Sequence, residues 1–97
     1  MTEDQGNNVK KKRSFKQGTV VIFDPESFNP DFWVNLKEEE RIKYYGELGY
    51  GSPKMKFFVF ICEINESGHC VLVDMDTNEV ITMRHTCDFR EATEEEF

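Results

Sequence analysis

The chain has 97 residues and a mass of 11.4 kDa, which allows one modest hydrophobic core and excludes a large enzyme. Its aromatic content of 13% excludes a disordered chain. No apolar run approaches the roughly 20 residues of a membrane helix. The net charge of −7 is unevenly distributed. Residues 1–17 carry five basic and two acidic side chains, a net charge of +3, and residues 18–97 carry seven basic and seventeen acidic ones, a net charge of −10.

This asymmetry predicts a disordered basic arm over residues 1–17 and a single domain over residues 18–97. An acidic domain repels a phosphate backbone, so we expect contact with nucleic acid only through the arm, at Lys10, Lys11, Lys12 and Arg13. Met1 is followed by polar residues, and we expect no secretory signal. Three cysteines, an odd number, then indicate reduced thiols and a cytoplasmic location.

The first half of the chain predicts one strand and one helix. Residues 19–23 form a β-branched run typical of a strand, and Asp24-Pro25 and Asn29-Pro30 are turn signals. Asn35 is a candidate helix cap, since Glu38 follows at the spacing of a capping box. We therefore expect a helix of about three turns over residues 36–45, with Gly46 as its stop.

The second half predicts an antiparallel meander. Residues 56–64, 69–75 and 80–85 read as strands, and the short links between them are rich in turn-forming residues. Residues 88–90 are expected to form one tight turn, and the acidic segment 91–97 has room for a short last strand.

Side-chain alternation suggests a register for this meander. With Phe58, Phe60, Cys62 and Ile64 on one face, Ile64 would lie opposite His69, Cys62 opposite Val71, Phe60 opposite Val73 and Phe58 opposite Met75. A three-residue loop, Thr77-Asn78-Glu79, would then keep the next strand's face apolar by placing Ile81 beside Met75, Met83 beside Val73 and His85 beside Val71. This loop needs one residue with positive φ, which Asn78 tolerates.

The predicted class is mainly β with one short helix and about five antiparallel strands, the helix being inserted after the first strand. This arrangement, from Thr19 onward, resembles a small SH3-like barrel, in which a single helical turn precedes the last strand; residues 88–90 lie where that turn would fall. The resemblance implies a fold and no function. The chain is also similar in style to small proteins encoded by bacteriophages and mobile elements, which implies an inhibitor or regulator of a host protein.

Aromatic and acidic residues are concentrated in the insertion over residues 28–50. One interpretation is that these aromatics cover the sheet as part of the core. Another is an exposed binding surface, because Tyr and Trp are enriched where protein partners dock and charge lies at the rim. A third is an aromatic cage for a cation. The candidate partner-binding residues are Phe28, Phe32, Trp33, Tyr44, Tyr45, Tyr50, Glu38 and Glu39.

The predicted register also brings histidines and cysteines to one end of the meander, with His69 opposite Cys87 and His85 diagonal to His69. Histidine and cysteine are the residue types that most often bind zinc, and the candidate ligands are His69, His85, Cys87 and, further away, Cys62. The chain has no Cys-x-x-Cys or His-x-x-x-His spacing. The alternatives are a buried, weakly polar face or a thiolate–imidazole pair. No third residue that would orient such a pair is evident, so we expect no enzyme and no cofactor.

The sequence therefore favours a non-enzymatic protein-binding module that uses residues 28–50. Three alternatives stay open. The first is a zinc-containing or thiol-dependent protein, and the second is a small-ligand pocket beneath the helical insertion. The third is an acidic surface that imitates nucleic-acid phosphates, for which Glu38-Glu39-Glu40 and Glu94-Glu95-Glu96 are the densest segments. Exposed glutamate runs are otherwise simply solvated.

Overall fold

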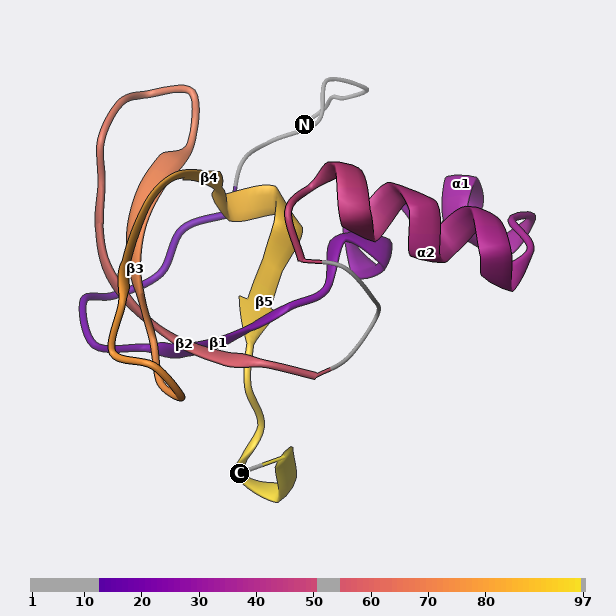
Figure 1. The fold of residues 1–97 in the computed structure, drawn as a ribbon. Coiled ribbons are helices and arrows are strands. Elements are labelled where there is room, and N and C mark those ends of the chain that lie inside the picture. Colours follow the sequence, from indigo (N-terminus) through magenta and orange to yellow (C-terminus); the bar gives the residue numbers. More distant parts are fainter. Residues whose placement is uncertain (1–12, 51–54, 97) are drawn as a thin grey trace.

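The computed structural model describes residues 13–50 and 55–96, which fold around a five-stranded antiparallel sheet (Figure 1). The sheet order is β4-β3-β2-β1-β5. The strands are β1 (Val20–Phe23), β2 (Phe57–Glu63), β3 (His69–Asp74), β4 (Val80–His85) and β5 (Phe89–Glu91). The mainly β class, with five antiparallel strands and a helical insertion after the first, is confirmed.

A bulge in β2 changes the predicted register with β3. Cys62 lies opposite Val71 as predicted, but the pairing shifts between Phe60 and Cys62. Phe60 therefore lies opposite Leu72, and Phe58 opposite Asp74. The extra residue turns Cys62 outward while Phe58 and Phe60 remain in the core, so the prediction of one continuous face from Phe58 to Ile64 was wrong.

The link between β3 and β4 is longer than the predicted three residues, because the Asp74 side chain starts the turn early. Its Oδ1 accepts hydrogen bonds from the backbone N–H groups of Asp76 (2.8 Å) and Thr77 (3.4 Å). Asn78 does have positive φ, at 63°, as predicted. The predicted pairs were wrong, and the observed ones are Val80 with Val73, Ile81 with Leu72, Arg84 with Cys70 and His85 with His69.

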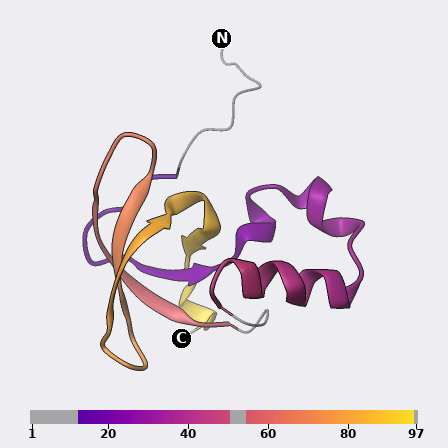
Figure 2. The same cartoon turned by 45° about the horizontal axis from the view of Figure 1, so that its top comes forward.

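The insertion contains two α-helices where the sequence predicted one. Both lie to one side of the sheet (Figure 2). Pro30 opens α1 (Pro30–Val34), since a first-turn residue needs no N–H partner. Asn35 ends α1 and does not cap α2 (Glu38–Glu47), where the Glu40 carboxylate accepts a hydrogen bond from the N–H of Lys37 (3.0 Å).

The predicted stop at Gly46 was also wrong. Gly46 lies inside α2, which ends at Glu47. The residue with positive φ just beyond the helix is Gly49, at 94°. A Cβ there would lie 3.0 Å from Arg84 Nη2, the movable end of a long side chain, so it is the backbone conformation that favours glycine at this position.

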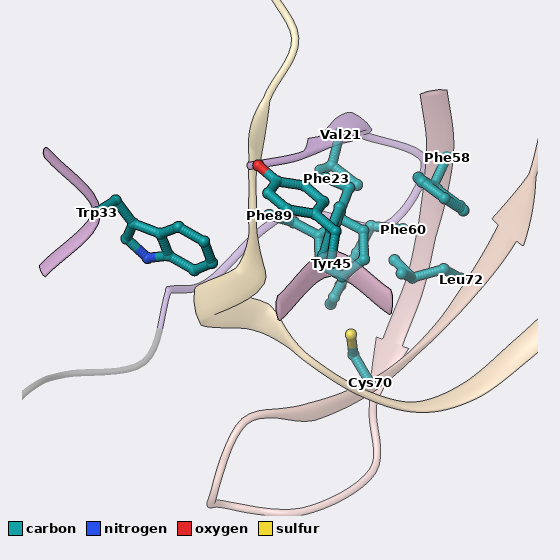
Figure 3. Packing of buried hydrophobic residues seen from close by; sticks show 9 residues of the cluster. All are labelled: Val21, Phe23, Trp33, Tyr45, Phe58, Phe60, Cys70, Leu72 and Phe89. Atoms are coloured by element: carbon teal, nitrogen blue, oxygen red, sulfur yellow. The ribbon is translucent and has the colours of Figure 1, made fainter. Parts of the chain in front are cut away.

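Aromatic side chains join the insertion to the sheet (Figure 3). Tyr45 of α2 packs edge-on against Phe23 of β1, with ring centroids 5.1 Å apart, and Trp33 of α1 packs on Tyr45 at 5.7 Å. Beneath them, Phe58 and Phe89 are fully buried. The core cluster consists of Val21, Phe23, Trp33, Tyr45, Phe58, Phe60, Cys70, Leu72 and Phe89.

The segment before β1 contacts the domain. Arg13 Nη1 donates a hydrogen bond to the carbonyl of Phe89, and the Phe15 ring lies 5.5 Å from that of Phe60. The predicted boundary at residue 17 therefore divides a packed segment. The rest of the predicted arm, including Lys10, Lys11 and Lys12, lies outside the described residues.

The end of the chain differs from the prediction by a few residues. A 3-10 turn, η3 (Thr86–Asp88), precedes β5, which begins at Phe89 rather than after residue 90. A second short turn, η4 (Glu94–Glu96), is held by Arg90, whose guanidinium binds both Glu96 carboxylate oxygens (2.8 and 2.6 Å) and Asp24 (2.7 Å).

Candidate functional site

The candidate residues of the insertion separate into buried and exposed groups. Trp33 and Tyr45 are 7% and 4% exposed, so they belong to the core and cannot offer their rings as an open docking surface. Phe32 and Tyr44 are 43% and 37% exposed, and Phe28 is half-buried. Glu38 and Glu39 are both exposed in the first turn of α2.

Tyr45 has a structural role through its hydroxyl. The hydroxyl donates a hydrogen bond to Glu26 Oε2 (3.0 Å), and Glu26 Oε1 pairs with Arg41 Nη2 (3.2 Å). The same Arg41 nitrogen donates to the carbonyl of Trp33 (3.2 Å). Burial and the Glu26 carboxylate both raise the pKa of Tyr45. These contacts fix α2 against α1 and the 3-10 turn η2 (Pro25–Ser27).

Tyr50 is turned toward the sheet. Its ring stacks on Phe23 with centroids 4.0 Å apart, and its hydroxyl accepts a hydrogen bond from Arg84 Nε (3.0 Å). The Arg84 guanidinium also lies 5.3 Å from the Tyr50 ring centroid. Burial raises the pKa of Tyr50, although Arg84 opposes this effect. Tyr50 therefore supports the sheet, which leaves the exposed aromatic surface to Phe32 and Tyr44.

A pocket of about 300 Å³ lies where the insertion meets η3; it is called the insertion pocket below. Its walls combine aromatic rings with two carboxylates, those of Glu47 and Asp88. Burial raises the pKa of Asp88, and the charges of His85 and Arg84 oppose this effect. The lining residues are Pro25, Phe28, Asn29, Trp33, Tyr44, Glu47, Leu48, Cys87 and Asp88.

The pocket contains residues that the sequence interpretation missed. Glu47 and Leu48 lie three and four residues after Tyr44, so helical spacing could have placed them beside it. Asp88 gave no local signal, because a long-range hydrogen bond from the Asp24 N–H to the Asp88 carbonyl (2.7 Å) holds η3 against η2.

The histidines and cysteines do not form the predicted arrangement. His69 lies opposite His85, with ring centroids 5.5 Å apart, and not opposite Cys87. The prediction was wrong because β4 ends at His85 and the chain turns into η3. The Cys87 N–H donates to His85 Nδ1 (3.2 Å), and Cys62 is exposed on the outward face of β2.

Cys70, absent from the predicted set, is the buried cysteine. Its thiol donates to the carbonyl of Arg84 (3.2 Å), and burial raises its pKa to about 11. Within residues 13–50 and 55–96, no group of three or more His, Cys, Asp or Glu side chains is placed to hold a metal ion. The described residues therefore do not bring three of the candidate ligands His69, His85, Cys87 and Cys62 together.

Comparisons of the chain with protein-family models, curated proteins and solved structures found no match. The resemblances to SH3-like barrels and to phage-encoded proteins thus remain predictions. None of the described helices has the length and apolar character needed to span a membrane.

Proposed function

We propose that this chain is a non-enzymatic protein-binding module whose partner docks on the outer surface of the helical insertion. The observation that carries the proposal is an exposed pair of aromatic rings, one on α1 and one on α2. Phe32 and Tyr44 are 43% and 37% exposed, and their ring centroids lie 5.5 Å apart beside a well-buried core. Exposed aromatic side chains of this kind are typical anchors of protein interfaces.

Glutamates border this surface, as expected for the polar rim of an interface. Glu38, Glu39 and Glu40 are consecutive and exposed in the first turn of α2. Their charge favours a partner with a basic surface and would accelerate its association. Cys62, Cys70 and Cys87 are not joined in a disulfide bond, which fits a cytoplasmic setting. An inhibitor or regulator of a host protein is the form of binding that the resemblance to phage proteins suggests.

The test is quantitative capture from a nuclease-treated bacterial lysate with the tagged full chain. Phe32→Ser combined with Tyr44→Ser removes two exposed apolar side chains from the insertion. Met75→Ser combined with Val80→Ser is the matched control, because these residues are 45% and 66% exposed outside the insertion. We expect the wild type and the control to retain one stoichiometric protein that the insertion variant loses.

Two results would contradict the proposal. One is a partner that the insertion variant retains and the control variant loses. The other is binding that disappears with added salt equally in all three proteins, since screening acts on charged surfaces. The second result would instead favour the acidic surface as an imitation of nucleic-acid phosphates.

A further inference from the structure

The insertion pocket brings aromatic rings and carboxylates together from four segments. Phe28 follows η2, Trp33 belongs to α1 and Tyr44 to α2. Glu47 comes from the last turn of α2 and Asp88 from η3. Its surface is mostly apolar, and Glu47 and Asp88 add two carboxylates to it. Arg13 lies over the Phe28 ring, and the charges of His85, Arg84 and Arg13 reach Asp88 from outside the lining.

The two carboxylates and the faces of the aromatic rings favour a positively charged group in this pocket. The face of an aromatic ring is electrostatically negative and attracts a cation by about 0.5–1 kcal/mol at exposed sites, more where water is excluded. The chain already uses one of these rings in this way, because the Arg13 guanidinium lies 5.3 Å from the Phe28 ring centroid. The Asp88 carboxylate is partly desolvated, which raises its pKa, and a cation in the pocket would offset that cost.

We propose that the insertion pocket binds the ammonium or guanidinium group of a basic side chain presented by a protein partner. The inference deepens the proposed function and rests on it. The pocket volume of about 300 Å³ is at the lower end of the range for ligand sites and suits one side chain rather than a large ligand. The partner would place an apolar surface on Phe32 and one basic residue between Tyr44 and Asp88.

The test uses the full chain and two small probes that differ in one charge. The cationic probe is Nα-acetyl-lysine methyl ester, and the neutral probe is its Nε-acetylated form. Trp33 is the single tryptophan of the chain and lines the pocket, so its fluorescence and its indole N–H resonance report occupancy. We expect the cationic probe to change both signals in a saturable way and the neutral probe to change neither over the same concentrations.

Three variants locate the charge that matters. Glu47→Gln and Asp88→Asn each remove one charge from the pocket with little change of shape. We expect each to lower the affinity for the cationic probe about two- to fivefold, which corresponds to the energy of an exposed ion pair. Glu94→Gln removes an exposed charge outside the pocket and should leave binding unchanged. Equal binding of the neutral probe, no response to either probe, or an equal effect of all three variants would overturn the inference.

Failure of this inference can be distinguished from failure of the proposed function. If Glu47→Gln and Asp88→Asn capture the partner as the wild type does while the Phe32→Ser/Tyr44→Ser protein does not, the cation site is wrong and the docking surface stands. If the cationic probe binds selectively but no protein is captured, the pocket serves a free amine, and the assignment to a partner side chain is wrong.

Discussion

Two neighbouring residues of α1 are expected to respond in opposite ways to truncation, because the structure assigns Trp33 to the core and Phe32 to the surface. Trp33 is 7% exposed and its ring lies within 5.4–5.8 Å of Phe32, Tyr44 and Tyr45, measured between centroids. Replacing a buried aromatic residue by alanine typically costs about 3–5 kcal/mol in the free energy of unfolding. A domain of this size has roughly 5–15 kcal/mol in total, so Trp33→Ala should be severely destabilised.

Truncating Phe32 should lower the free energy of unfolding much less. Burying a whole Phe side chain contributes about 1.5–3 kcal/mol to the free energy of unfolding. Phe32 is 43% exposed, so truncating it should remove roughly half of that contribution, about 1 kcal/mol. The lost edge contacts with Trp33 and Tyr44 add about 0.5 kcal/mol at the lower end of the known range. Phe32→Ala should therefore leave a folded protein with impaired partner binding.

Urea unfolding followed by far-UV circular dichroism measures the free energy of unfolding of both variants. This signal does not depend on tryptophan fluorescence, which Trp33→Ala removes. We expect the two variants to differ by about 1.5–3.5 kcal/mol in the free energy of unfolding. Equal costs, or a Trp33→Ala cost below about 1 kcal/mol, would refute the division of α1 into a core face and a binding face.

Four further predictions concern stability, cysteine reactivity and pH. Gly46→Ala, inside α2, should raise stability by about 0.5–1 kcal/mol, whereas Gly49→Ala should lower it by more than that; equal effects in urea unfolding would contradict the local geometry. Thr86 is fully buried and its Oγ1 has no hydrogen-bond partner among the described residues, so Thr86→Val should be neutral or should raise the thermal midpoint. A thiol reagent should modify exposed Cys62 before Cys70, which should react only on unfolding; mass spectrometry of partly labelled protein would show the reverse order if the β2 bulge were wrong. The Lys56 ammonium, 2.8 Å away, and two backbone N–H groups lower the pKa of Asp74. The stability that its ionised form contributes should therefore be complete above about pH 4 and be lost as the pH falls through the lowered pKa. In an acid titration of the free energy of unfolding, Asp74→Asn should remove this pH-dependent loss.

The strands were predictable from sequence because their signals are local. β-branched and aromatic runs, separated by short turn-rich links, gave four strands to within a residue or two at each end. The register was not predictable, because the β2 bulge inserts one residue after Phe60 without a sequence signal. The early turn at Asp74 was not predictable either, because it forms when the Asp74 carboxylate accepts backbone hydrogen bonds from the residues that follow.

The site was predictable in region but not in detail. Aromatic density pointed to the insertion, yet α1 has five residues and is too short for periodicity to tell which of Phe32 and Trp33 is buried. Asn35 met the local pattern of an N-cap, but Pro30 had already begun a helix that Asn35 ends. Asp88 joins Tyr44 across the pocket through contacts between segments far apart in the chain, which no local pattern encodes.

Docking of a protein partner on α1 and α2 would bury part of both helices, and amide hydrogen exchange can detect that burial. The exchange of the full chain is measured alone and with the captured partner, and the protected segments are located by mass spectrometry. We expect binding to slow exchange over Pro30–Val34 and Glu38–Glu47 and to leave the β3–β4 hairpin unchanged. Protection confined to that hairpin, with α1 and α2 exchanging as in the free chain, would contradict it.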